Sequence, residues 1–353
     1  MKQTVVLKVD SQQPDIEKVR VAANIIREGG SVAFPTETVY GLGADALNSK
    51  AVTALFEAKK RPIDNPPIVH VENISDVYRL AEQIPPKADQ LMKEFWPGPL
   101  TLVFKRSETV PDVTVAGLDT IAVRMPQHAV ALALIRESRG PIAAPSANLA
   151  GKPSPTSAEH VFNDLNGRID AILNGGPTRI GVESTVLDLS VEPAMVLRPG
   201  GTSLETLKMI LSDVKLHPFV VTEKELAIEN TRSPGMKHRH YAPKAPVIVV
   251  EGMITAVMAT VKLLIANYWL QDKRVGVLAT AETAWAYEAD VVKSLGSRRN
   301  VDAIAANLFR LLREFDEEKV DIIITESVPT EGLGLAVMNR LRKASGYNIV
   351  KAG

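Results

Sequence analysis

The sequence predicts an α/β protein built from two domains. Between Val5 and about Asp213, short runs rich in β-branched residues alternate with stretches whose apolar residues recur at helical spacing. After an irregular stretch that ends near residue 245, the same alternation begins again with PVIVVEG. The length of 353 residues exceeds what one hydrophobic core usually supports, which also favours two domains.

In the first region, the runs with strand composition are SVAFPT, PPIVHV, LTLVF, TIAVRMP, PIAAPSAN, AILNGG, STVLDLS and AMVLRPG. The stretches with helical spacing are 15–28, 50–60, 86–95, 128–138, 157–165 and 203–212. In the second of these helices Ser49 is the expected cap, Val52, Leu55 and Phe56 share one face, and Pro62 ends it. This order of elements predicts a mixed sheet with helices packed on it.

The second region repeats a strand-then-helix unit: PVIVVEG, a helix at 254–270, RVGVLAT, a helix at 301–315, DIIITESV and a helix at 334–345. Such repeats predict a smaller domain with a parallel, Rossmann-like sheet. Between the two regions lies TRSPGMKHRHYAPKAP, which contains three prolines and no acidic residue. We therefore expect a first domain over 1–212, a basic linker over 213–245 and a second domain over 246–353.

The composition limits the classes of function. Lys and Arg together number 41, as do Asp and Glu, so an anionic partner must meet a local cluster of cations. The sequence contains no cysteine, which excludes disulfides, thiolate nucleophiles and cysteine-ligated metals. Phosphate-loop, dinucleotide, zinc-protease and serine-elbow motifs are also missing. With no long apolar run, we expect a cytoplasmic protein that does not enter the membrane.

Cations and small polar side chains stand next to the predicted strands. They are Thr36, Thr38, Lys59, Arg61, Arg124, Ser146, Asn148, Ser184 and Arg198. Ligands in open α/β sheets bind at the carboxyl ends of strands, so these side chains could converge there. Guanidinium and ammonium groups suit phosphate oxygens, whereas hydroxyls and amides suit sugar and base groups.

Each residue also has a purely structural reading. Lys59 and Arg61 follow a helix end, where the helix dipole favours cations, and Ser146 and Asn148 are typical turn residues. An arginine at a strand end is often a surface ion pair, and His70, between two valines, is typical of a structural histidine. His238 and His240 without a third ligand are a weak metal signal, so no protein metal site is expected.

The combination of motifs is more specific than its parts. FPTETVYGLG, KKRP followed by PP and a histidine, VRMP, APSAN and GVESTV occur in this order. They resemble the YrdC-like domain, and with HRHYAPKAP and the second α/β region the chain resembles the two-domain form of the threonylcarbamoyl-AMP synthase family. The resemblance implies a nucleotidyltransferase that joins L-threonine, bicarbonate and ATP, with Mg²⁺, into threonylcarbamoyl-adenylate and pyrophosphate for tRNA modification.

The resemblance also implies the site. Lys59 and Arg61 would be the catalytic cations facing the triphosphate. The L-threonine pocket would be formed by Thr38, His70, Arg124, the backbone at Ala144, and Ser184. The nucleotide contacts would be Arg61, Asn65, Thr120, Ser146, Asn148, Ser154, Arg198 and Tyr241. Because Tyr241 lies in the linker, the linker is expected to act as a lid over the site.

Two other functions remain open. The first domain could be a module that binds double-stranded RNA or a tRNA stem, although zero net charge and only 5% aromatic residues count against it. Carbamoyl transfer in hydrogenase maturation would pair a YrdC-like domain with zinc fingers, which a chain without cysteine does not have. The expected partners are the small substrates, a tRNA threonylcarbamoyltransferase protein, and tRNA indirectly or weakly.

Overall fold

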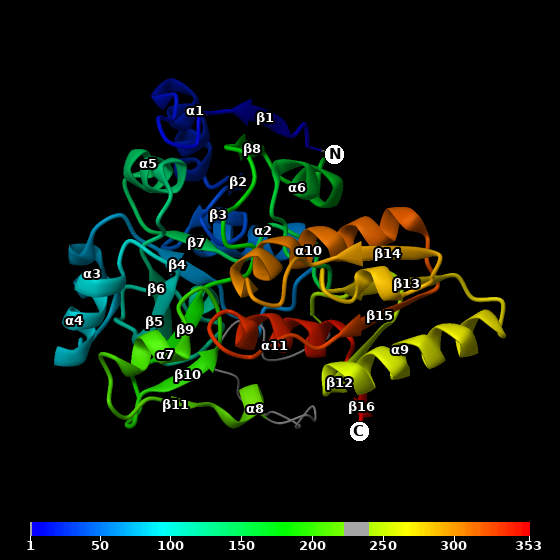
Figure 1. The fold of residues 1–353 in the computed structure, drawn as a ribbon. Helices are drawn as coiled ribbons and strands as arrows, with labels where there is room; N and C mark the ends of the chain where they lie inside the picture. The colour runs from blue at the N-terminus through cyan, green and yellow to red at the C-terminus, as the bar shows by residue number, and fades with distance from the viewer. Residues whose placement is uncertain (1, 222–239) are drawn as a thin grey trace. The chain divides into compact units, whose positions relative to one another are not determined.

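The computed structural model describes residues 2–221 and 240–353. The described residues form two compact units (Figure 1). The first unit contains residues 2–150 and 154–221, and the second contains residues 151–153 and 240–353.

The first unit is organised around one mixed sheet of eleven strands in the described residues. In spatial order they are β1 (Val5–Lys8), β8 (Ala171–Asn174), β2 (Val32–Phe34), β3 (Gly41–Asp45), β7 (Ile142–Ala144), β4 (Ile68–His70), β6 (Thr120–Arg124), β5 (Leu100–Lys105), β9 (Thr185–Asp188), β10 (Met195–Arg198) and β11 (Lys215–Leu216). The sheet contains both parallel pairs, such as β4 with β6, and antiparallel pairs, such as β5 with β6. The predicted mixed sheet is confirmed.

The described helices of the first unit are α1 (Ile16–Arg27), α2 (Ser49–Lys59), α3 (Val77–Leu80), α4 (Pro86–Phe95), α5 (Ala129–Ser138), α6 (Ala158–Leu165), α7 (Leu204–Lys208) and α8 (Pro218–Val221), with short 3-10 turns η1 (Ile74–Asp76) and η2 (Asp112–Val115). Six of these described helices, α1, α2 and α4–α7, lie close to their predicted positions, whereas the short helices α3 and α8 were not predicted. Helices α1 and α5 pack side by side (Figure 1). The expected cap of α2 was wrong by one residue, because the Asn48 side chain accepts from the Lys50 and Ala51 amides and Ser49 is already helical.

The strand β3 was not predicted. It contains Gly41 and Gly43, and glycine is depleted in strands. The ring of Phe34 on the neighbouring strand β2 occupies the space over both glycines, so that a Cβ at Gly43 would lie 2.9 Å from Phe34 Cε1. The glycines therefore make room for Phe34, and the chain pairs as a hairpin around the loop 35–40.

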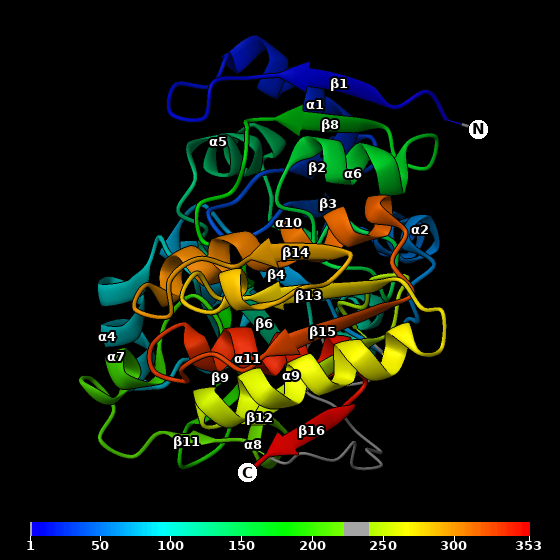
Figure 2. The ribbon, with the colours of Figure 1, turned by 45° about the vertical axis from the view of Figure 1, so that its right-hand side comes forward.

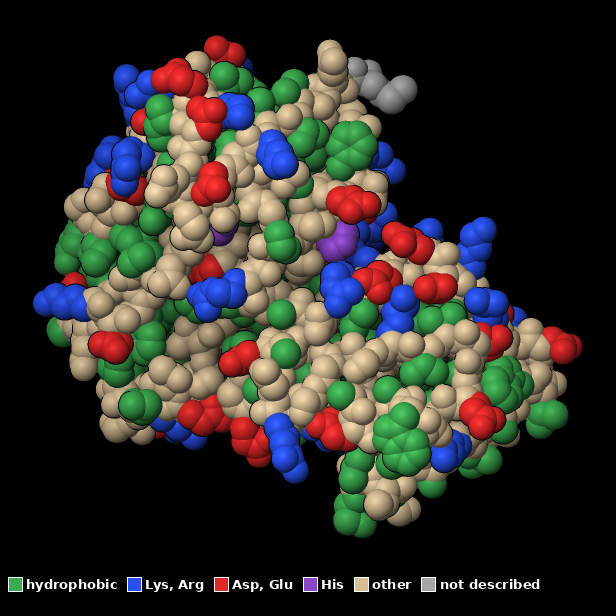
Figure 3. Space-filling view, turned by 45° about the horizontal axis from the view of Figure 1, so that its top comes forward, with side chains coloured by type: hydrophobic (Ala, Val, Ile, Leu, Met, Phe, Trp, Pro, Cys, Tyr) green, Lys and Arg blue, Asp and Glu red, His purple; other side chains and the backbone are tan. Residues whose placement is uncertain are grey.

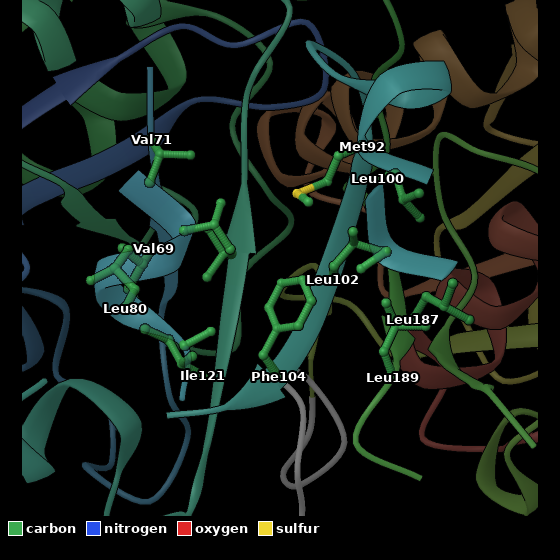
Figure 4. Close-up of a cluster of buried hydrophobic side chains, with 14 of the residues drawn as sticks. Val69, Val71, Leu80, Met92, Leu100, Leu102, Phe104, Ile121, Leu187 and Leu189 are labelled. Atoms are coloured by element: carbon green, nitrogen blue, oxygen red, sulfur yellow. The ribbon is translucent and has the colours of Figure 1, made fainter. Parts of the chain in front are cut away.

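One core of the first unit lies between the β4–β6–β5–β9 part of the sheet and helices α3 and α4 (Figure 4). Leu100, Leu102 and Phe104 alternate along β5 toward this core and are almost completely buried. Ile121 of β6 and Met92 of α4 pack in the same cluster. Burying side chains of this size stabilises the fold by about 1.5–3 kcal/mol each, which fixes the strands that carry the polar residues described below.

The second unit is a parallel five-stranded sheet with helices on both faces (Figure 2). Its strands, in spatial order, are β14 (Val291–Ser294), β13 (Val275–Ala279), β15 (Ile322–Glu326), β12 (Val247–Gly252) and β16 (Ile349–Ala352). Its helices are α9 (Ile254–Trp269), α10 (Val301–Glu318) and α11 (Gly334–Ala344), with the 3-10 turn η3 (Ala284–Ala286). Val275 and Val277 face the α9 side, whereas the intervening Gly276 faces Phe315 of α10. The predicted parallel, Rossmann-like sheet is confirmed, with β14 and β16 as additional strands.

The predicted linker is only partly described. Residues up to 221 group with the first unit, where β11 pairs with β10, and residues from 240 group with the second unit. Residues 222–239, including His238, lie outside the described residues. The domain boundaries at 212 and 245 and the lid therefore stay predictions.

Candidate active site

The loop between β2 and β3 is a buried turn held by hydroxyl groups. Thr36 Oγ1 lies 2.8 Å from Thr38 Oγ1 and donates to the Val39 carbonyl at 2.6 Å. The same oxygen accepts from the Thr38 and Val39 amides. Because side chains of this type bond readily to nearby backbone amides, the run Thr-Glu-Thr folds locally and fixes the direction of Thr38.

Arg124, the last residue of β6, is anchored on this loop. Its Nη1 donates to Thr38 Oγ1 at 3.0 Å, and its Nε donates to the Gly98 carbonyl at 3.1 Å. Its Nη2 lies 2.7 Å from Glu37 Oε2, and both side chains are at least 95% buried. The expected neighbours Thr38 and Arg124 are therefore in direct contact, and the guanidinium is held in one orientation.

Glu37 is the site residue that the sequence analysis missed. Its partner Arg124 lies 87 residues away in the chain, so the ion pair could not be read from local pattern. A signal was nevertheless present, because Glu37 is an acid between a predicted buried strand and a Gly-Leu-Gly run. A buried acid needs a partner, which points to one of the arginines at the strand ends.

His70 lies on β4, paired with Arg124 in the parallel register of β4 and β6. Its Nδ1 is 3.1 Å from the Ile68 carbonyl, and its ring meets Phe34 edge to face. Burial, and next the nearby Arg124 charge, lowers the pKa of His70 to about 3. The ring is therefore neutral near pH 7, and backbone carbonyls of Ile68 and Ile142 are its hydrogen-bond partners.

Ser184 and Arg198 form a second buried group. Arg198 donates from Nε and Nη2 to the Ser184 carbonyl at 3.2 and 3.0 Å, and from Nη2 to its hydroxyl at 3.2 Å. The Ser184 hydroxyl also lies 2.8 Å from Thr101 Oγ1 on β5. The antiparallel pairing of β9 with β10 brings the start of one strand beside the end of the other, which places the two residues together.

Lys59, Ser146 and Asn148 form a third group. Lys59 is 1% exposed and its Nζ donates to the carbonyls of Ser146 and Asn148. The Ser146 hydroxyl donates to Asn148 Oδ1 at 2.5 Å. The ammonium group therefore fixes the turn that follows β7.

The remaining nucleotide candidates lie near these groups. Arg61 donates from Nε and Nη2 to the Asn65 carbonyl at 3.1 and 3.0 Å, which shapes the loop after α2. The Ser154 hydroxyl donates to the buried Glu183 carboxylate at 2.5 Å. Glu183 directly precedes Ser184, so this contact adjoins the second group.

Backbone hydrogen bonds connect the loops that carry these groups. Ile180 and Gly181 donate to the carbonyls of Glu37 and Thr38, which joins the first group to the loop that leads to Ser184. Ala147 donates to the Tyr40 carbonyl, which joins the same loop to the Ser146–Asn148 turn. The three groups therefore belong to one connected region of the first unit.

Three of the predicted site residues are not members of the three groups described above. Ala144 is buried at the end of β7 opposite Ile68. Thr120 is buried at the start of β6, four residues and about 13 Å along the strand from Arg124, so it does not join that group. Tyr241 has a φ of +64°, and its ring stacks on Phe309 and lies near Arg340 inside the second unit. Their predicted contacts with ligands stay predictions.

The described residues contain neither a candidate metal cluster nor a candidate membrane-spanning helix. Within residues 2–221 and 240–353, no group of three or more His, Asp or Glu side chains could hold a metal ion. Over the same ranges, none of the helices has the length and apolar character needed to span a bilayer.

Comparisons with known proteins give a consistent result. Residues 24–200 match the family described as "Telomere recombination", and residues 202–346 match the family described as "Threonylcarbamoyl-AMP synthase, C-terminal domain". The chain is 54% identical to a threonylcarbamoyl-AMP synthase of Pyrococcus abyssi over 95% of this chain and 96% of that one. It is 52% identical to one of Bacillus subtilis over 95% and 94% of the two chains. The crystal structure of P. abyssi Sua5 complexed with L-threonine superimposes with a TM-score of 0.94 and 52% identity, over 99% of this chain and all of that one.

Proposed function

The chain belongs to the threonylcarbamoyl-AMP synthase family, and we propose that it joins L-threonine, bicarbonate and ATP into L-threonylcarbamoyl-adenylate and pyrophosphate. The threonine amine, after loss of a proton, takes up CO2 derived from bicarbonate as a carbamate. A carbamate oxygen then forms a bond to the α-phosphorus of ATP, and the bond from that phosphorus to pyrophosphate breaks. The substrate supplies the nucleophile, so the protein's task is to orient two anions and stabilise charge.

The L-threonine pocket is assigned to the first group. Thr38, Arg124 and His70 are buried and held by short contacts, and Ser184 adjoins them through the loop at 180–184. The guanidinium would attract the amino-acid carboxylate, and the neutral His70 ring adds no second charge beside it. The P. abyssi protein that contained L-threonine has nearly the same fold, which supports this assignment.

The nucleotide is assigned to Arg61, Asn65, Ser146, Asn148, Ser154 and Arg198, with Thr120 and Tyr241 as further candidates. Arg61, half-buried after α2, would neutralise charge on the departing pyrophosphate. Lys59 would act by holding the Ser146–Asn148 turn as well as by its charge. Mg²⁺ would enter with ATP and be coordinated largely by phosphate oxygens, as it commonly is in nucleotide-dependent enzymes.

The observation that carries this proposal is the hydrogen-bonded connection of Thr38 and Arg124 to the loops of Ser184 and of Ser146–Asn148. Mass spectrometry of a reaction with ¹³C-bicarbonate tests it. We expect an adenylate of L-threonine that carries one ¹³C atom and forms only when all three substrates are present. An adenylate without the label would contradict the proposal.

The chemistry of the product indicates which protein would act next. An adenylate with a mixed anhydride is reactive, so a transferase that carries the threonylcarbamoyl group to tRNA is the expected consumer, and the cytoplasm is the expected location. Direct RNA binding is the competing function. Basic and acidic side chains are interspersed over the face shown in Figure 3, which gives no long cationic stripe there for a nucleic-acid backbone. Salt-dependent RNA binding unaffected by ATP and L-threonine would favour the RNA module.

A further inference from the structure

The carboxylate of Glu37 has acceptor capacity that the described residues do not use. The side chain is at least 95% buried, and neither oxygen makes a hydrogen bond of normal geometry, although Arg124 Nη2 lies 2.7 Å away. The adjacent hydroxyls of Thr36 and Thr38 bond to each other, to Val39 and to Arg124 instead. Buried carboxylates are normally hydrogen-bonded, so this one is prepared for a donor from outside the protein.

The charges around Glu37 define that donor. Arg124 neutralises Glu37, and the other two guanidinium nitrogens are held by the Gly98 carbonyl and the Thr38 hydroxyl. His128 is also near enough for the Glu37 charge to raise its pKa, but burial has the larger effect and keeps the pKa of His128 below its ordinary value. The buried charges at this place are therefore one positive charge, on Arg124, and one negative charge, on Glu37.

A zwitterion matches this pair better than a simple anion does. A carboxylate placed against Arg124 would also be close to Glu37, which repels it. An α-amino acid carries its ammonium next to its carboxylate, so each end meets an opposite charge and the site keeps its neutrality. Glu37 Oε2 and Arg124 Nη2 are 2.7 Å apart, so the two protein charges are neighbours, as the ammonium and carboxylate of an amino acid are.

We propose that Glu37 recognises the α-ammonium group of the amino-acid substrate and so selects amino acids over the corresponding hydroxy acids. This inference rests on the proposed function, since it requires an amino-acid substrate in the Arg124 pocket. Glu37 is then a specificity-determining residue that the sequence motif alone does not reveal.

The test uses the full chain and two ligands that differ only at the α-position. They are L-threonine and (2S,3R)-2,3-dihydroxybutanoate, in which a hydroxyl replaces the ammonium. Isothermal titration compares the wild type, Glu37→Gln, and the control Glu137→Gln, whose carboxylate pairs with Arg20 at the surface. We expect Glu37→Gln to bind L-threonine about 10- to 100-fold more weakly and the hydroxy acid as well as or better than the wild type does, because a charged hydrogen bond is lost only for the amino acid. The control should match the wild type for both.

Other results would overturn the proposal. Equal weakening of both ligands in a folded Glu37→Gln protein would assign Glu37 a merely structural role. Tighter L-threonine binding would mean that Glu37 competes with the ligand carboxylate for Arg124. If Glu37→Gln does not fold, Glu37→Asp replaces it and should keep the preference for the ammonium, so equal binding of both ligands would count against the proposal. A wild type that does not bind L-threonine would instead refute the proposed function, on which this inference depends.

Discussion

Arg124 Nη1 donates a 3.0 Å hydrogen bond to the hydroxyl of Thr38, which lies 86 residues earlier in the chain. The contact joins the end of β6 to the loop between β2 and β3, and it holds the guanidinium beside Glu37. The proposed amino-acid pocket is therefore preorganised around two residues that the sequence motifs had placed in separate segments.

The first prediction concerns this hydrogen bond. Thr38→Val keeps the shape of the side chain but removes the acceptor, so we expect L-threonine to bind about tenfold or more weakly. Thr38→Ser keeps the hydroxyl and should bind within about threefold of the wild type. Isothermal titration gives both values, and equal affinities in the two variants would show that the hydroxyl plays no part.

Arg61 should matter for turnover and little for stability. Its side chain is half-buried and contacts the Asn65 carbonyl on the same loop. Arg61→Ala should lower pyrophosphate formation by about 100-fold or more, because charge on the leaving group loses its stabilising cation. The melting temperature should change by no more than about 2 °C. A variant that kept a third of the wild-type rate would rule out the assigned role.

Lys59 should be structurally important, in contrast to its neighbour Lys60. Lys59→Met leaves the carbonyls of Ser146 and Asn148 without their ammonium donor, and unsatisfied buried groups cost about 1–3 kcal/mol each. We expect the free energy of unfolding in urea to fall by about 2–4 kcal/mol. Lys60→Met, at an exposed position, is the matched control and should lose less than about 1 kcal/mol. Equal stability of the two variants would argue against the anchoring role.

His70 should make the folded state sensitive to acid. Its pKa is about 3 in the fold, whereas an unfolded histidine titrates near 6.5, so below that pH the unfolded state binds a proton that the folded state does not. Stability should therefore fall as the pH drops from about 6.5 towards 3, with a contribution of about 2 kcal/mol lost at pH 5. Urea titrations at several pH values measure this.

The control is His70→Gln, which cannot take up the proton. The stability difference between the wild type and this variant should shrink as the pH falls from 6.5 to 5. A difference that stays constant over that range would mean that folding does not change the pKa of His70, and a difference that widens would mean that folding raises it.

Gly43 should tolerate no side chain. An added Cβ would lie 2.7 Å from Ile142 Cγ2 and 2.9 Å from Phe34 Cε1, and overpacking of this kind costs about 1–3 kcal/mol. Gly140→Ala is the control, because a Cβ there meets nothing within 4 Å. Urea denaturation should separate the two variants by at least about 1 kcal/mol, and equal midpoints and slopes would contradict the packing described for β3.

The fold was largely predictable because hydrophobic periodicity is local. The helices α2 and α10 and the strands β5 and β15 lie within a few residues of the predicted ranges. Strand β3 was not predicted because its glycines are required by a contact with Phe34 on a neighbouring strand. A local sequence pattern does not contain that contact. The cap at Asn48 was missed for a smaller reason, since Ser49 is an equally good capping residue by type.

The site was less predictable than the fold. Residue types indicated that Thr38 and Arg124 bind anions and hydroxyls, but the pairing of Arg124 with Glu37 depends on how distant strands meet. The same holds for Lys59, whose ammonium group bonds to two backbone carbonyls. Backbone acceptors have no sequence signature, so such contacts appear only in three dimensions.

Pyrophosphate release from ATP, with L-threonine, bicarbonate and Mg²⁺ each omitted in turn, tests the central claim most directly. We predict that release requires all three, because the carbamate of L-threonine is the nucleophile and the ATP phosphates need their counter-ion. Release that continues at the same rate without L-threonine, or without bicarbonate, would contradict this account.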